Sequence, residues 1–121
     1  MNTNSIARVC YEASKAYCEA NGDYSHVSWD EATGSTTGGL VKAIQFYIQN
    51  PSAGAARVHD ILVKEMLEAG WRSGPRMSHL KKEDPFLVPF SELSRIQKVR
   101  NRIIFSIAHE CLQVLDQGKK E

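Results

Sequence analysis

The sequence predicts a mainly α-helical protein, a compact helical domain of about four helices with short β-strands around residues 71–74 and 86–90. Apolar residues recur at intervals of three and four over several long segments, which is the helical period. Glycines, prolines and capping residues separate these segments. A chain of 121 residues suits one domain, which we place at residues 6–117, followed by a solvated tail at 118–121.

The first predicted helix covers residues 5–20, and Gly22 is a suitable residue to end it. Ser28 followed by Glu31 fits a capping box and predicts a short helix that carries Trp29. We interpret the glycine-rich segment 33–39 as a loop, because it lacks the Gly-Lys-Ser/Thr ending of a phosphate-binding loop.

Two further helices are expected at residues 40–49 and 53–69, since Pro51 and Gly70 are suitable stops. Residues 71–90 lack a helical period, and the proline-bounded segment 86–90 fits a short edge strand that residues 71–74 can join. Ser94 and Gln97 form a second capping box. It starts the last helix, which we expect to reach about Gln117 with a broad apolar face. That face is either covered by the other helices or forms a dimer seam.

Composition limits the cellular locations and the classes of partner that we expect. The formal net charge of +1 argues against a polymeric nucleic-acid partner, which normally requires a strong basic excess. The polar N-terminal segment has no apolar region typical of a secretory signal, and three cysteines do not suit a disulfide framework, so we expect a reducing cytoplasm. No apolar run approaches the roughly 20 residues of a membrane span.

Motifs for catalysis or metal binding are not evident. The four histidines show no HxxxH spacing, and the cysteines show no CxxC spacing. Cys10, Cys18 and Cys111 fall on apolar helix faces, where they are interpreted as small core residues. No pair of carboxylates stands out as an acid/base couple. We therefore expect no catalytic residues, no metal and no cofactor.

Charge segregation points to a binding role instead. Residues 72–82 and 95–102 are two basic zones without an acid. If the first zone packs beside the start of the last helix, the two form a basic cleft for a small anion, because arginine suits phosphate. The alternative is that both zones are solvated faces. Trp29 and Trp71 lie at element boundaries, where a tryptophan is either a core plug or a wall on which a base stacks.

Several segments in combination resemble the ryanodine-receptor (RyR) domain family over about residues 6–105. They are "IARVCYEA", "GDYSHVSWDEA", "AIQFYIQNP", His59, "EAGWRSGP" and "DPFLVPFSELSRIQK". Five positions or pairs depart from the family pattern: Tyr11, Leu62, Asp84, Phe90 and Arg100–Asn101. The resemblance implies an α-rich fold with a few short strands. It also implies the single-copy type found in bacteria and their phages, in which a homodimer restores the tandem pair of the receptors.

The resemblance further implies a sensor of small nucleotide-derived ligands in anti-phage defence. We therefore expect a non-enzymatic binding domain for a signal such as a cyclic ADP-ribose isomer or a cyclic oligonucleotide, acting as a receptor or as a phage sponge. In this hypothesis Trp71, Trp29, Tyr11 and Phe90 stack on a base. Arg72, Arg76 and Arg100 hold phosphate, and His59 hydrogen-bonds a ribose hydroxyl or a phosphate. The alternatives are a protein-interaction module and, third, a signal-degrading enzyme.

Overall fold

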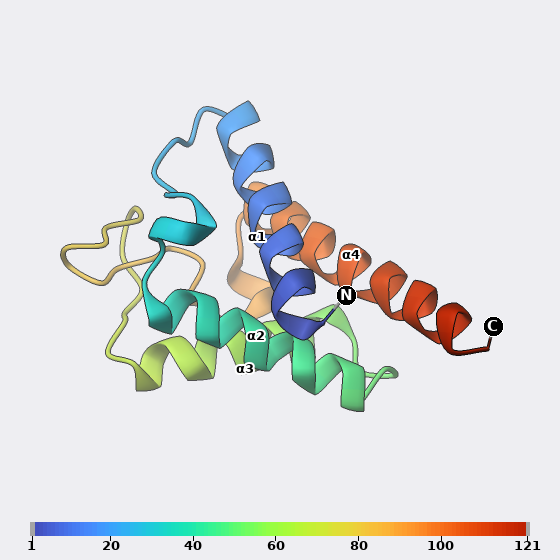
Figure 1. The fold of residues 1–121 in the computed structure, drawn as a ribbon. Helices are drawn as coiled ribbons and strands as arrows, with labels where there is room; N and C mark the ends of the chain where they lie inside the picture. Colours follow the sequence, from blue (N-terminus) through green and yellow to red (C-terminus); the bar gives the residue numbers. More distant parts are fainter. Residues whose placement is uncertain (1, 121) are drawn as a thin grey trace.

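The computed structural model describes the backbone of residues 2–120 and the side chains of residues 2–114. It contains four α-helices: α1 (Thr3–Ala20), α2 (Gly34–Gln49), α3 (Ala55–Glu68) and α4 (Arg95–Lys120). Two short 3₁₀ turns, Trp29–Glu31 and Phe90–Glu92, lie in the connections. The predicted mainly helical fold with four long helices is confirmed (Figure 1).

The helices form two pairs. α1 packs along α4, and α2 packs along α3, so that the second pair runs across one side of the first (Figure 1). An apolar cluster lies between the pairs, and all four helices contribute buried side chains to it: Ile6, Cys10, Leu40, Ile44, Tyr47, Val58 and Ile104. A second cluster, of Met66, Trp71 and Leu87, holds the long connection after α3 against the helices.

The start of α2 corrects the prediction of a loop at residues 33–39. Thr33 is the N-cap, whose side-chain oxygen accepts a hydrogen bond from the Thr36 amide at 3.3 Å, and the helix begins at Gly34. Three glycines lower the intrinsic helix propensity here, but tertiary packing outweighs it. Gly39 lies where α3 approaches: an added Cβ would be 3.4 Å from Leu62 and 3.5 Å from Met66. This glycine therefore serves close helix packing.

The expected strands are not found in the described residues, where residues 71–94 form only isolated bridges. Arg72 pairs with Glu83, and Ser78 pairs with the same residue, so residues 71–74 do not join residues 86–90. The backbone of the second segment finds other partners: the Phe86 amide donates to the Asp84 carboxylate, and the Val88 carbonyl is bonded by His59. Pro89 in this segment, like Pro85 just before it, also lacks the amide that a ladder needs.

The two predicted capping boxes have different outcomes. Ser94 and Gln97 bond reciprocally at 3.2 Å, as predicted, and α4 starts directly after them. Ser28 makes no side-chain cap, and the Trp29 amide instead donates to the Glu12 carboxylate of α1 at 3.0 Å. This contact ties the 3₁₀ turn to the first helix.

α4 continues beyond the other helices, so its C-terminal part projects from the body in Figure 1. The predicted solvated tail at 118–121 concerns side chains outside the described ones. Cys10 and Cys18 are buried and Cys111 is half-buried, all as free thiols. Among the described helices, none combines the length and the apolar character needed to cross a membrane.

Candidate functional site

Trp71 lies in the core, which contradicts its expected role as a stacking wall for a ligand. Its side chain is 0% exposed and packs with Met66 and Leu87. The indole nitrogen donates to the Ser35 hydroxyl at 2.9 Å, so the polar end of the ring is already satisfied. Of the two alternatives for this residue, the core plug is the one observed.

Tyr11 and Trp29 also serve packing. The Tyr11 hydroxyl donates to the Val27 carbonyl at 2.6 Å, and burial raises the pKa of this phenol to about 12. The two rings meet edge to face, with centroids 5.7 Å apart. Trp29 is half-buried against the apolar cluster, so only part of its ring is open to solvent.

His59 is buried in an aromatic environment, and Phe90 is half-buried beside it. The His59 ring meets Phe86 edge-on at 4.6 Å and Phe90 at 6.2 Å. Its Nε2 atom lies 2.7 Å from the Val88 carbonyl oxygen. Burial lowers the pKa of this histidine. These contacts give His59 a structural role, holding the 86–90 segment on α3.

Arg72 and Arg76 are exposed on the connection after α3. The Arg72 guanidinium donates to the carbonyls of Leu67 and Trp71, at 3.2 and 2.7 Å. It thereby caps the C-terminal end of α3, where a cation is favoured by the helix dipole. Neither arginine lines a pocket shared with Arg100.

Arg100 is the predicted site residue whose placement fits a binding role. It is only 8% exposed, and its guanidinium carbon lies 4.3 Å from the centre of the Phe86 ring. It makes no salt bridge or hydrogen bond with any residue whose side chain the structure describes, and its buried Nε has no partner. A buried charge is costly unless it is paired, and a ring face offsets only part of that cost.

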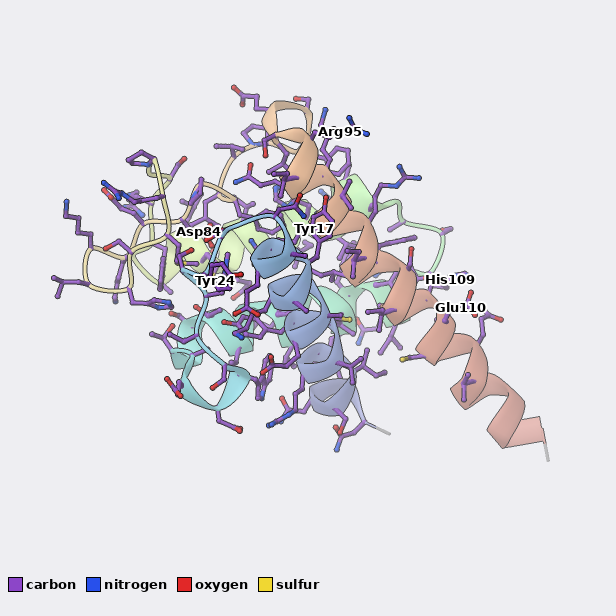
Figure 2. All side chains as sticks on the ribbon, turned by 90° about the horizontal axis from the view of Figure 1, so that it is seen from above. Tyr17, Tyr24, Asp84, Arg95, His109 and Glu110 are labelled. Carbon is purple, nitrogen blue, oxygen red and sulfur yellow. The ribbon has the colours of Figure 1, made fainter. Side chains whose placement is uncertain are left out.

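A pocket of about 150 Å³ opens beside Arg100. It lies between the C-terminal end of α1, the connection after α1, the loop before the 3₁₀ turn Phe90–Glu92, and the start of α4. The residues that line it are Cys18, Asn21, Asp23, His26, Met77, Asp84, Pro85, Ser94, Ile96, Gln97 and Arg100. Figure 2 shows Asp84 on its loop near the connection that carries Tyr24. A smaller cavity of about 30 Å³, room for one water molecule, is lined by both Arg100 and Tyr11.

The loop 72–82 and the start of the last helix line the same pocket, which meets the condition set for a basic cleft, but they do not make one. The loop contributes Met77 to the pocket, and its cations are not among the lining residues. The wall carries two carboxylates, Asp23 and Asp84, against the single guanidinium of Arg100. The pocket is thus polar and mixed in charge.

Burial and charge set the protonation of the pocket wall. Burial, followed by the positive charge of Arg100, lowers the pKa of His26 to about 4, so its ring is neutral near pH 7. Burial raises the pKa of the Cys18 thiol. Burial also raises the pKa of Asp23, but hydrogen bonds from Ser25 outweigh this effect, and the pKa lies below its usual value.

Sequence reasoning missed Asp23, His26, Asp84 and Gln97 as pocket residues. Asp84 was noted only as a departure from the family pattern, and Gln97 only as a capping residue. Their separation along the chain gives no periodic signal. The order "GDYSH", a glycine stop followed by the polar residues Asp23 and His26 one and four positions later, is the one local hint that side chains return to the end of α1.

Together, the fold and the pocket define a four-helix domain with a polar cavity built around an arginine that has no partner among the described side chains. No protein-family model, curated protein or solved structure matches this chain. The resemblance to the RyR domain family therefore stays a prediction.

Proposed function

We propose that the protein is a non-enzymatic binding domain for a small phosphorylated, nucleotide-derived signalling molecule. The observation that carries this proposal is Arg100, a buried guanidinium that faces a pocket and has no anionic partner among the described side chains. A ligand phosphate would supply the missing charge through bonds to the planar fork. The resemblance to RyR domains supports the nucleotide class, with a cyclic ADP-ribose isomer or a cyclic oligonucleotide as candidates.

One other pocket group suits the sugar of such a ligand. Asp84 offers a carboxylate that can accept a hydrogen bond from a ribose hydroxyl. The pocket is smaller than the ~300–1,000 Å³ usual for ligand sites. We therefore expect a phosphoribosyl group to enter and the base to lie at the mouth, where the exposed Tyr24 follows Asp23 in the chain. No bond of the ligand is broken, as a receptor or a sponge requires.

A thermal-shift and mass-spectrometry screen tests the proposal. The probes are cyclic ADP-ribose isomers, ADP-ribose, and cyclic di- and trinucleotides. A binder at a hundredfold excess over its dissociation constant should stabilise the fold by about 2.7 kcal/mol. Arg100→Met should remove the shift while the protein stays folded, because replacing a buried ion by an apolar side chain is often neutral for stability. Arg102→Met, an exposed position on the same helix, is the matched control.

Two results oppose the proposal. Either no probe shifts the melting curve of the unaltered chain, or the Arg100→Met variant binds as well as the control. Recovery of intact ligand after denaturation distinguishes a sponge from a signal-degrading enzyme, which would release a product.

A protein-interaction module is the second candidate. It is favoured by the exposed loop around Leu80, a large apolar side chain that is 95% exposed and is followed by Lys81 and Lys82. Under this alternative no nucleotide shifts the melting curve, and Leu80→Ser weakens capture of the partner.

We also propose a homodimer. The outer face of α4 supports it, because Val99, Ile103 and Ile107 line a shallow groove of about 370 Å³ there. Light scattering of the full chain should give twice the mass of 13.5 kDa. A mass of one chain at micromolar concentration would exclude the dimer.

A further inference from the structure

Three side chains with metal-binding atoms converge on one edge of the pocket. They are the thiol of Cys18, the carboxylate of Asp23 and the imidazole of His26, and their ligand atoms all lie within 4.8 Å of one another. We propose that these residues bind one zinc ion. This departs from the sequence-based expectation of no metal, because the three ligands follow no known spacing and meet only through the fold.

The end of α1 brings the first two ligands together. The Asp23 amide donates to the Cys18 carbonyl at 2.9 Å, and the Gly22 amide donates to the Glu19 carbonyl at 3.0 Å. This is the bond pattern of a Schellman motif, in which a glycine with positive φ reverses the chain. Gly22 has φ 87°, and Asp23 is thereby held next to Cys18.

The third ligand follows from a tight turn. The Asp23 Oδ1 atom accepts hydrogen bonds from the Ser25 amide at 3.0 Å and from the Ser25 hydroxyl. This turn directs His26 back toward the helix end. The Asp23 Oδ2 atom takes no part in these bonds and lies 3.7 Å from His26 Nδ1.

His26 is the independent observation that points to a ligand. Its side chain is 5% exposed, and neither ring nitrogen has a hydrogen-bond partner. Buried polar atoms are nearly always satisfied, so two orphan nitrogens on one ring require an explanation, such as a bound ion. A neutral imidazole is also the form that binds metals.

The spacing and the atom types suit zinc. Two ligands on a tetrahedral zinc ion, at about 2.0–2.1 Å each, lie about 3.3 Å apart, so the observed 3.7 Å requires only a small adjustment. One sulfur, one nitrogen and one carboxylate oxygen form a donor set that zinc accepts. Three protein ligands leave the fourth position open to the pocket, for water or an anion.

The local charge also accommodates a dication. Arg100 repels it, but Asp23 and Asp84 outnumber this cation. As the zinc–sulfur bond forms, the Cys18 thiol releases its proton to solvent, and the thiolate adds a third negative charge. The zinc dication and the guanidinium are then balanced by these three anions.

Metal titration of the full chain, freed of metal by a chelator, tests the inference. We expect one zinc per chain in competition with a chromophoric chelator, and a sulfur-to-metal charge-transfer band when cobalt(II) replaces zinc. Cys18→Ser should abolish the band, and Asp23→Asn should weaken zinc binding at least tenfold. Cys111→Ser is the matched control and should keep both properties, because Cys111 lies on α4, outside this pocket.

The inference is overturned if the unaltered chain shows no band, or if Cys18→Ser retains it. Should Cys18→Ser fail to fold by circular dichroism, the half-exposed Asp23 gives the decision, since Asp23→Asn leaves the core intact. Unchanged zinc affinity in Asp23→Asn also overturns the site. The inference does not rest on nucleotide binding, because metal titration requires no nucleotide, so either proposal can fail alone.

Discussion

At a binding surface, arginine and tryptophan side chains are usually open to the ligand. In this protein, both Arg100 and Trp71 are buried. The cation lies against the ring of Phe86 with little exposure, and the indole is withdrawn completely from solvent. An anchor for a ligand must keep an unmet bonding capacity. Arg100 keeps it, whereas the indole nitrogen of Trp71 is already bonded to Ser35.

Trp71→Ala should therefore destabilise the fold rather than remove binding from a folded protein. Removing a fully buried aromatic side chain costs about 3–5 kcal/mol of unfolding free energy. Urea unfolding followed by circular dichroism measures this loss. Trp29→Ala, at a half-buried position, should cost clearly less. A Trp71→Ala protein of unchanged stability would contradict the core assignment.

The orientation of individual side chains at the site could not be predicted from the sequence. Trp71, Arg72 and Arg76 lie within six consecutive residues, yet Trp71 faces the core and both arginines face solvent. The direction in which a side chain points from an aperiodic loop depends on contacts with residues far away in the sequence. An example is the hydrogen bond from the Trp71 indole to Ser35 on α2. No local pattern contains that information.

At the scale of elements, the loop between α3 and α4 depends on one close approach. An added Cβ at Gly74 would lie 2.6 Å from the Cβ of Glu83, the residue that forms both bridges. This is closer than non-bonded carbon atoms allow, so the backbone must shift. The loop that brings Met77 and Asp84 to the pocket is therefore sensitive at this glycine.

Gly74→Ala should lower the unfolding free energy by about 1–3 kcal/mol, the usual cost of overpacking. Gly38→Ala is the control: it lies inside α2 with open space around it, and alanine should stabilise the helix by about 0.5–1 kcal/mol. Thermal unfolding should show a lower melting temperature for Gly74→Ala and a higher one for Gly38→Ala than for the unaltered protein. Equal effects would show that the close approach at Gly74 is unimportant.

The helices were predictable and the connections were not. Helical period and the Ser94–Gln97 box located four helices, because both signals are local. The prediction failed for residues 34–39, where packing on α3 outweighs weak propensity. It also failed for residues 86–90, where side chains take the backbone bonds that a strand would use.

At the scale of the whole molecule, two buried neutral histidines couple stability to pH. Burial lowers the pKa of His59 and of His26 from an ordinary value of 6.5. Below this value the unfolded chain takes up protons that the folded chain does not bind. The free energy of unfolding therefore falls as the pH falls, by up to about 1.4 kcal/mol per pH unit for each histidine.

His59→Gln should make the free energy of unfolding fall less steeply below pH 6.5, because the lowered pKa of His59 no longer contributes, while glutamine retains a side-chain donor for the Val88 carbonyl. Urea unfolding at several pH values gives the slope for each protein. An equal slope in both proteins would mean that His59 is protonated in the folded state.

The pocket itself is a property of the whole molecule. It requires the end of α1, the connection after it, the loop before α4 and the first turns of α4 in one place. The sequence allowed the basic loop to meet the last helix without predicting it, and the orientation of each side chain there follows from the packing of all four helices.

The pairing of α1 with α4 has a consequence for how the chain is made. The Cys10 thiol of the first helix lies 3.4 Å from the Ile104 carbonyl of the last, 94 residues further along. α2 and α3 are neighbours in sequence and can associate early, whereas contacts across such a long stretch form slowly because loop closure must come first. During synthesis, the part of the apolar stripe of α1 that packs on α4 therefore stays uncovered until α4 has left the ribosome. In that interval the exposed apolar surface makes the nascent chain prone to aggregation.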